Sequence, residues 1–425
     1  MTPARSRISD TKRLLFGVGY EDTFIVEPFA GRRALDEYEL TQHYENWAAD
    51  LGLAVDAGAD YARWGIPWYC VNPERGVWDF AWIDEVADRF RELGLRPVID
   101  LMHYGTPLWL EGSFANPDYP QHMAAYAAKI AERYGDVFRA FTPLNEPLLN
   151  AIYCGEFGIW PPHLTGERGF ATLLERLGRG IVECQAAIAE VSGGEAEFVH
   201  VEASYRFTGE TERFPEEVAF LRERQFVVED LVTGRIGQDH PLASWLLAQG
   251  FAEESLAWHR DHVALPDVMG VNYYPQVSTE AFVSGSRVPA GTLDDPRPRV
   301  DEGTEGLVDV LTRFWQRYQA PVMLTETSVA GDAAAQTRWL DASVATVHRL
   351  RSEGMPILGY TWWAVLDWYT WNYREQRAPL HDYVTRQGLW SLVPEADGSL
   401  RRVRTSTVDR FRGHAAASLE LSGRR

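Results

Sequence analysis

Short apolar runs alternate with longer stretches of mixed character along the whole chain. Several of the short runs end at proline or at a polar cluster, which is typical of buried β-strands. In the longer stretches apolar residues recur every three or four positions, which is typical of helices packed on a sheet. The eight predicted strands cover residues 14–20, 61–66, 97–102, 141–145, 198–203, 268–273, 321–326 and 357–363.

Helical patterns separate the predicted strands. In the first of them Trp47, Leu51 and Val55 recur every four positions, and Gly58 marks the end. Strands that alternate with helices indicate a parallel sheet, and eight of them close a (β/α)8 barrel, the TIM barrel. We therefore expect an α/β fold with a single (β/α)8 domain over residues 1–425 and a barrel core at about 14–411. The other predicted helices cover 82–94, 123–134, 170–191, 214–230, 243–248, 306–318, 333–351 and 403–411, and 283–301 is predicted to be a long loop beside a site.

The charge of the chain restricts its partners. The 425 residues carry a formal net charge of −20, and such a surface repels nucleic acids and anionic membranes. We therefore expect a small-molecule substrate, no nucleic-acid partner and no membrane partner, and the sequence leaves the oligomeric state open. The 16 Trp, 18 Tyr and 19 Phe residues are many for a soluble enzyme. Aromatic faces pack well against the C–H side of sugar rings.

The cysteines and the apolar runs bear on location. Cys70, Cys154 and Cys184 are too few and too scattered for a disulfide framework or a zinc site. No apolar run reaches the 18 residues that a membrane helix needs, and no secretory apolar segment follows the basic N-terminal residues. The expectation is a cytoplasmic protein with reduced thiols.

Two glutamates follow predicted strands that are far apart in the sequence. Glu146 precedes Pro147, which has no N–H for a sheet hydrogen bond and should end the strand at the glutamate. Glu326 ends the seventh strand, 180 residues after Glu146. The fourth and seventh strands lie three apart around an eight-stranded ring, so their carboxyl ends face each other across the barrel mouth. Two carboxylates are the minimum for cleaving a glycosidic bond, and a retaining mechanism needs them about 5–5.5 Å apart.

Further motifs point to a known family. They are TPLNEP at 142–147, LTETS at 324–328, YARWGIPW at 61–68, NYY at 272–274 and WAVLD at 363–367. In these motifs, in their order along the chain and in their places at strand ends, the chain resembles the family 1 glycoside hydrolases, which are retaining β-glycosidases on a (β/α)8 barrel. The resemblance extends from about residue 16 to about residue 389.

The resemblance implies roles that spacing alone does not assign. It makes Glu146 the general acid/base and Glu326 the nucleophile, with Asn145 on the sugar 2-hydroxyl. It also implies that Arg63 and Tyr274 keep Glu326 ionised through charge and hydrogen bonding. Sugar contacts are implied for His103, Trp363 and Trp371. Other roles remain open for three of these residues. Arg63 could form a salt bridge in the barrel interior, and His103 and Trp363 could be core residues.

Four positions differ from the family pattern. Glu21 stands near a usual Gln, Tyr104 at a usual Trp, Thr327 at a usual Asn and Thr370 at a usual Glu that grips the far hydroxyls of the sugar. A site that hydrogen-bonds particular hydroxyls discriminates strongly, so these changes should alter the preferred sugar. We therefore expect that the main substrate is not an ordinary glucoside or galactoside. Glu21 and Glu202 are candidates for new polar contacts, with surface or structural roles equally open.

The sequence thus favours a retaining β-glycosidase that needs no metal and no cofactor and acts on a small β-glycoside. A transglycosylase of the same mechanism is one alternative, because an acceptor can intercept the glycosyl-enzyme. A catalytically silent sugar-binding barrel is another, motivated by Thr327 and Thr370. A metal-dependent barrel hydrolase is the third, and it predicts sensitivity to chelators.

Overall fold

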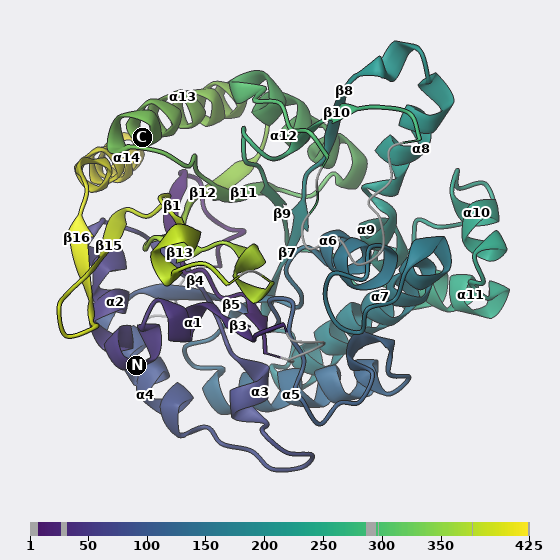
Figure 1. Cartoon of the computed structure of the whole chain (residues 1–425), viewed down its shortest axis with the longest axis horizontal. Coiled ribbons are helices and arrows are strands. Elements are labelled where there is room, and N and C mark those ends of the chain that lie inside the picture. The colour runs from purple at the N-terminus through teal and green to yellow at the C-terminus, as the bar shows by residue number, and fades with distance from the viewer. Residues whose placement is uncertain (1–6, 27–31, 286–294, 296, 376, 424–425) are drawn as a thin grey trace.

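Eight parallel strands close into a barrel at the centre of the molecule (Figure 1). The computed structural model describes residues 7–26, 32–285, 295, 297–375 and 377–423. The order around the ring follows the chain, and the last barrel strand pairs with the first, with Gly17 beside Thr361. The strands are β1 (Leu15–Gly19), β4 (Tyr61–Gly65), β5 (Arg96–Asp100), β6 (Ala140–Thr142), β7 (Glu197–Ala203), β9 (Val268–Asn272), β11 (Val322–Thr327) and β12 (Ile357–Trp363).

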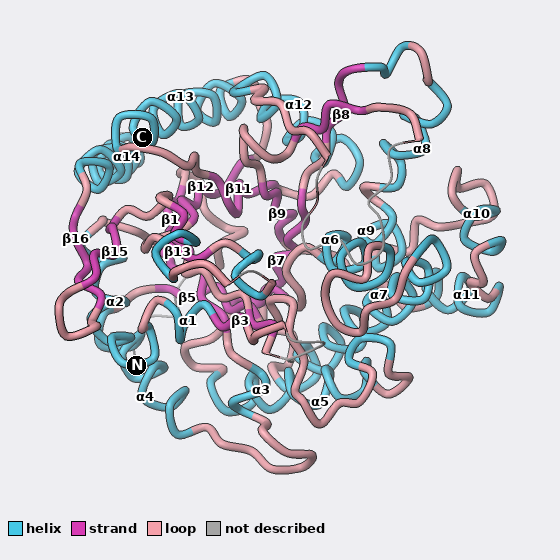
Figure 2. Tube along the Cα trace, viewed as in Figure 1, coloured by secondary structure: helices cyan, strands magenta, loops and turns pink. Residues whose placement is uncertain are grey.

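Helices surround the barrel (Figure 2). Each long helix lies between barrel strands in the chain and packs its apolar side on the sheet, as the (β/α)8 pattern requires. The expected fold class is therefore confirmed, while a single domain for the whole chain stays a prediction. The long helices are α2 (His43–Asp56), α4 (Ala81–Leu93), α5 (Tyr119–Tyr134), α7 (Gly166–Val191), α12 (Gly303–Tyr318), α13 (Ala333–Ser352) and, after the last strand, α14 (Ser406–Gly423).

Smaller elements extend the barrel. The parallel pair β8 (Arg206–Gly209) and β10 (Thr279–Phe282) projects outward together with α8 (Pro215–Arg224), as Figure 1 shows. Among the described residues no helix is both long and apolar enough to span a membrane. The short helices between barrel elements are α1 (Glu37–Leu40), α3 (Trp68–Val71), α6 (Pro147–Asn150), α9 (Val227–Val232), α10 (Ala243–Ala248) and α11 (Glu253–Asp261).

The interior of the barrel is filled by apolar side chains from all eight strands, including Leu15, Tyr61, Val98 and Met323. The packing is tight, because a Cβ added at Gly17 would lie 2.2 Å from the Tyr61 ring. Side chains two residues further along a strand point to the same face. The inward positions toward the carboxyl ends of the strands are therefore left to polar groups, which build the site described below.

Four local predictions were wrong. The fourth strand stops at Thr142 and does not reach the glutamate, because Glu146 takes a left-handed backbone (φ 44°) as α6 begins. Val55 is 45% exposed, and the buried face of α2 lies on Leu51 and Ala54. The predicted helix at 214–230 is two helices, α8 and α9, separated at residues 225–226.

The closing helix was also misplaced at its start. Val403 belongs to β16 (Leu400–Arg404), which pairs antiparallel with β15 (Trp390–Pro394). The helix begins at Ser406 and continues well beyond Phe411. Of the long loop predicted at 283–301, residues 286–294 and 296 lie outside the described part of the chain, and the described part includes a bridge between Glu280 and Arg299.

Candidate active site

The polar side chains singled out in the sequence gather at the carboxyl ends of the barrel strands, the edge where TIM barrels carry their chemistry. Arg63 stands two residues after Tyr61 in β4, and Asp100 stands two residues after Val98 in β5, so both point into the barrel above its apolar filling. Both are 1% exposed. The site is therefore built on strand ends and not on free loops.

Glu326 lies in β11 and is held by two donors. Nη1 of Arg63 lies 2.5 Å from Oε1, and the Tyr274 hydroxyl donates to Oε2 at 2.7 Å. The side chain is buried, and this burial raises the pKa of the Glu326 carboxyl to about 8; Arg63 opposes the rise, and the carboxylate of Glu146 adds to it. The contacts expected for Arg63 and Tyr274 are thus present, and the barrel-interior salt bridge is present as well.

Arg63 connects Glu326 to the rest of the site. Its Nη2 lies 2.7 Å from Oδ2 of Asp100, and the same nitrogen donates to Oδ1 of Asn145 at 2.5 Å. One guanidinium thus contacts two carboxylates and one amide, all of them buried. A planar guanidinium with five donors suits such a junction.

Glu146 follows β6 and is held by side chains from the ends of β5 and β9. The Tyr104 hydroxyl donates to Oε2 at 2.5 Å, and Nδ2 of Asn272 donates to Oε1 at 2.8 Å. Its backbone N–H donates to the carbonyl of Val201 in β7, which orients the side chain toward the barrel mouth. Glu146 is 7% exposed and Glu326 is 4% exposed. Glu146 and Glu326, 180 residues apart in the sequence, thus belong to one hydrogen-bonded network.

His103 lies beside this network. Its Nδ1 is 2.7 Å from Oδ1 of Asp22 and 3.5 Å from Oδ2 of Asp100, and its Nε2 is 3.0 Å from Nδ2 of Asn145. Burial disfavours charge on the ring, but Asp22 and Asp100 outweigh it and raise the pKa of His103 well above its usual range. His103 therefore has polar partners in the protein and reaches the site through Asn145.

The buried Asp22, Asp100 and His103 lie close enough together to hold a metal ion. Each carboxylate already faces a cationic partner, however, since Asp100 pairs with Arg63 and Asp22 with His103. A metal ion would have to displace these partners at a desolvated position. The residues present do not fit a metal centre, and the metal-independent chemistry expected from the sequence stays a prediction.

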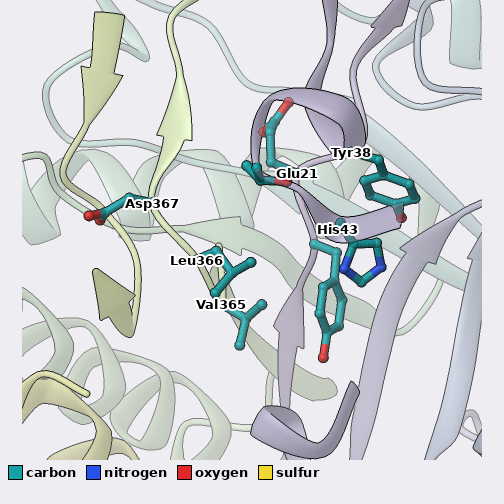
Figure 3. A pocket seen from close by; sticks show the side chains of 8 residues that line it. Glu21, Tyr38, His43, Val365, Leu366 and Asp367 are labelled. Atoms are coloured by element: carbon teal, nitrogen blue, oxygen red, sulfur yellow. The ribbon is translucent and has the colours of Figure 1, made fainter. Parts of the chain in front are cut away.

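Glu21 lies at the site, on the strand-end loop after β1. Its Oε2 accepts a hydrogen bond from Nε1 of Trp363 at 2.6 Å, and its Oε1 accepts one from the Thr23 hydroxyl at 2.6 Å. Beside it is a cavity of about 10 Å³, lined also by Tyr38 and His43 (Figure 3). That volume suits a single water molecule and not a sugar ring. The Trp363 indole N–H is therefore engaged by Glu21, and the guanidinium of Arg63 lies 4.8 Å from the centre of the ring.

Trp371 joins the site from the segment after β12. Its ring lies 5.7 Å from that of Tyr104 and 4.9 Å from that of Trp160. Its Nε1 is buried, and within the described residues it has no hydrogen-bond partner. A buried N–H of this kind is commonly satisfied by a bound molecule or a water.

The other candidates point elsewhere. The Thr370 hydroxyl donates to Oδ1 of Asn372 at 2.5 Å, and among the described residues no hydrogen bond links this hydroxyl to another predicted site residue. The Thr327 hydroxyl accepts from Nε1 of Trp339 in α13, on the outer side of the barrel. Glu202 is buried in β7, and it accepts the backbone N–H groups of Ala203 and of a residue in α6. Glu202 is thus a structural group and not a new polar contact of the site.

Sequence reasoning missed three side chains of the network. Asp100, Asn272 and the hydroxyl of Tyr104 all contact predicted site residues. Asp100 and Asn272 are the last residues of β5 and β9. Both stand one or two residues before the ends of the predicted strands 97–102 and 268–273, so a search for polar residues near each strand end, and not only at its last residue, would have found both.

Comparison with known proteins matches this chain to one family. Residues 17–176 match the sequence model of glycosyl hydrolase family 1. A β-glucosidase A of Thermotoga maritima is 24% identical over 359 residues, which cover 77% of this chain and 78% of that protein. A β-galactosidase of Sulfolobus acidocaldarius is 25% identical over 321 residues, which cover 68% of this chain but only 62% of that protein, less than two thirds of its length.

The fold agrees over almost the whole chain. A solved family 1 β-glucosidase of Thermotoga maritima superposes with a TM-score of 0.77 at 18% identity, covering 96% of this chain and 98% of that one. The order of the barrel strands, the strand-end network and the sequence match of the first strands all indicate similarity to one family. Over residues 17–176 this chain is thus similar to glycosyl hydrolase family 1, and it shares the barrel fold of a solved β-glucosidase of that family.

Proposed function

We propose that the chain hydrolyses a small β-glycoside with retention of configuration, with Glu326 as the nucleophile and Glu146 as the acid/base. The observation that carries the proposal is the buried network between the ends of β6 and β11. It runs from Glu146 through Tyr104, Asn145 and Arg63 to Glu326. Two carboxylates held rigidly at one barrel mouth are what glycosidic bond cleavage by double displacement requires.

In the first step a carboxylate oxygen of Glu326 attacks the anomeric carbon, and the glycosidic C–O bond breaks. Glu146 gives its proton to the departing oxygen, which leaves as an alcohol. In the second step a water molecule attacks the same carbon, Glu146 takes a proton from that water, and the ester bond to Glu326 breaks. The sugar leaves with its original configuration, and both carboxyl groups return to their starting state.

The two steps require the pair to share one proton in the free enzyme. Burial raises the pKa of Glu326, whereas Arg63 and the Tyr274 hydroxyl act against it. The reactive form has Glu326 ionised and Glu146 protonated. Arg63 and Tyr274 act toward that form, but burial leaves the pKa of Glu326 at about 8, so the shared proton must pass from Glu326 to Glu146 before the first step. Glu326 is therefore assigned as the nucleophile because a permanent cation touches it.

For the sugar itself, we propose contacts from Asn145, His103, Trp371 and the face of Trp363. Trp371 is the best supported of these, because its buried N–H has no acceptor in the described part of the protein. Glu21 adds a carboxylate beside Trp363, while Thr370 is turned to Asn372. The hydroxyl-reading groups at positions 21 and 370 therefore differ in chemistry from the family pattern, and we propose a main substrate other than an ordinary glucoside or galactoside.

The function is tested with a panel of aryl β-glycosides and with activated 2-deoxy-2-fluoro glycosides. The expected result is turnover of at least one member of the panel, with slow inactivation and one covalent sugar on the peptide that contains Glu326, found by mass spectrometry. Glu326→Gln should abolish labelling, and Glu353→Gln, at an exposed position directly after α13, should not. Binding of several sugars without labelling would instead support a silent sugar-binding barrel. Fast, saturable glucoside turnover would contradict the substrate part of the proposal.

A further inference from the structure

Tyr104 contacts the proposed acid/base directly. Its hydroxyl donates to Oε2 of Glu146 at 2.5 Å and accepts from Nδ2 of Asn145 at 2.7 Å. Nδ2 of Asn272 donates to the other oxygen of Glu146. Both oxygens of this carboxylate thus receive a donor, which favours the ionised form of the group. An indole at position 104, as the family pattern has it, carries no hydroxyl to make the contact.

The backbone and the packing hold the Tyr104 side chain in one place. Tyr104 and Glu146 both have left-handed backbones, with φ values of 74° and 44°. Such values are rare for bulky residues, and they persist where the surroundings determine them, often at functional sites. The ring of Tyr104 lies 4.5 Å from that of His103 and 4.9 Å from that of Trp160, and it is 3% exposed.

The phenol stays a donor at any working pH. Burial raises the pKa of Tyr104 well above its usual range, and the nearby carboxylates of Glu146 and Glu326 add to the rise. Around Glu146 the titratable groups on the packed elements are Glu202 in β7, Tyr205 after β7, Tyr274 after β9 and Glu326 in β11. In the described part of the chain only Tyr104 and Asn272 donate side-chain hydrogen bonds to it.

We propose that Tyr104 is a positioning residue that holds Glu146 ionised and oriented as the general base for breakdown of the glycosyl-enzyme. This inference rests on the proposed function. In that step water attacks the anomeric carbon, Glu146 accepts the water proton, and the electron pair of the breaking C–O bond returns to Glu326. A base that must be ionised gains from a donor on its carboxylate, whereas an acid that must be protonated does not.

The glycosyl-enzyme isolates this effect. Once Glu326 is an ester it no longer carries a charge, so the hydrogen bonds from Tyr104 and Asn272 act on Glu146 without that charged neighbour. An activated substrate such as a 2,4-dinitrophenyl glycoside makes the second step limiting, and the acidic limb of its kcat against pH then reports the ionisation of the base. Removing one donor from the carboxylate should move that limb upward by about one pH unit.

The experiment compares the wild type with Tyr104→Phe and Tyr318→Phe. The Tyr318 hydroxyl also donates to a buried carboxylate, Asp230, at 3.1 Å, but outside the barrel. The expected result is an upward shift of the acidic limb and a longer-lived fluoroglycosyl-enzyme in Tyr104→Phe alone, with little change of kcat on the alkaline side. Replacing Tyr104 by 3-fluorotyrosine, a stronger donor of the same shape, should move the limb downward and serves if the Phe variant does not fold.

Three results would overturn the proposal in different ways. An unchanged limb in both Tyr104 variants refutes the role of the phenol while leaving the proposed function intact. A pH-independent loss of activity with a raised KM identifies Tyr104 as a sugar contact or a packing group. A wild type that neither turns over nor becomes labelled at Glu326 refutes the proposed function, and the role of Tyr104 with it.

Discussion

Replacing Glu326 by glutamine should stabilise the folded chain, and the gain should grow with pH. Glutamine keeps the shape of the side chain and an oxygen that can accept from Arg63, but it carries no charge that must be buried. The carboxyl of Glu326 has a pKa raised by burial from 4.5 to about 8 in the folded protein. Removing a buried charge at a functional site is a recurrent exchange of activity for stability.

The sign follows from proton binding. Between pH 4.5 and about 8 the folded state holds the Glu326 proton while the unfolded chain has lost it. The folded state then binds more protons, so the free energy of unfolding falls as pH rises through this window. Below pH 4.5 both states are protonated, and the contribution of the group does not change further with pH.

The magnitude has an upper bound. The pKa difference of 3.5 between 4.5 and about 8, at about 1.4 kcal/mol per unit, sets a limit of roughly 5 kcal/mol at pH 8. Arg63 loses one carboxylate partner in the variant and keeps Asp100, which offsets part of the gain. We expect Glu326→Gln to raise the free energy of unfolding by about 2 kcal/mol at pH 8 and by almost nothing at pH 4.5.

Urea unfolding across a pH series from 4.5 to 8.5, followed by tryptophan fluorescence and circular dichroism, measures this gain. Glu353→Gln is the matched control, because Glu353 is an exposed residue directly after α13 whose ion-pair partner among the described residues is Arg349. The control should show no pH-dependent difference beyond a few tenths of a kcal/mol. A Glu326→Gln variant that is less stable than the wild type at pH 8 would show that Arg63 more than compensates the burial, and the reasoning would be refuted.

Glu146→Ala should slow aryl glycosides with poor leaving groups about 100-fold more than those with good ones, because only poor leaving groups need the proton. Measuring kcat across substituted phenyl glycosides, with and without azide, tests this, and equal losses for all leaving groups would contradict the acid role. Arg63→Met should lower kcat by about 10- to 100-fold and the free energy of unfolding by about 3 kcal/mol, since it removes the cation from Glu326 and leaves a buried carboxylate unpaired. Steady-state kinetics and urea unfolding measure the two effects, and a wild-type value in either measurement would contradict the assignment. Trp371→Phe should raise KM about tenfold with little change in kcat, because it removes one N–H and keeps the ring; an unaltered KM on every substrate would remove Trp371 from the sugar site. Prolonged dialysis against EDTA should leave activity unchanged, because the carboxylates beside His103 already face cationic partners; activity lost to EDTA and restored by a divalent ion would support the metal-dependent alternative.

The eight strands were predictable from the sequence because each is a continuous apolar run closed by a turn or a polar cluster, and both signals are local. The end of β6 could not be predicted in this way, because it depends on a contact with another strand. The backbone N–H of Glu146 donates to the carbonyl of Val201, 55 residues further on, and this turns the chain into its left-handed conformation before Pro147. Local proline chemistry alone placed the boundary three residues too late.

The contacts of the candidate site also divide into those that the sequence predicted and those that it missed. The contacts of Arg63 and Tyr274 with Glu326 were expected from the family resemblance, because those residues stand in recognisable motifs. The partner of Trp363 was not, since its indole bonds Glu21, 342 residues earlier in the chain. The hydrogen bond from Tyr104 to Glu146 was also missed, because a changed residue in a motif indicates that a contact differs without saying what replaces it.

The junction at Arg63 gives the covalent state a different electrical balance from the free enzyme. When Glu326 is ionised in the free enzyme, one guanidinium faces two carboxylates, those of Asp100 and Glu326, which leaves excess negative charge at the barrel mouth. Forming an ester at Glu326 would turn this trio into a neutral pair of Arg63 and Asp100. Each turnover would thus discharge the barrel mouth and recharge it, and an anionic leaving group would be repelled least while the sugar is still attached.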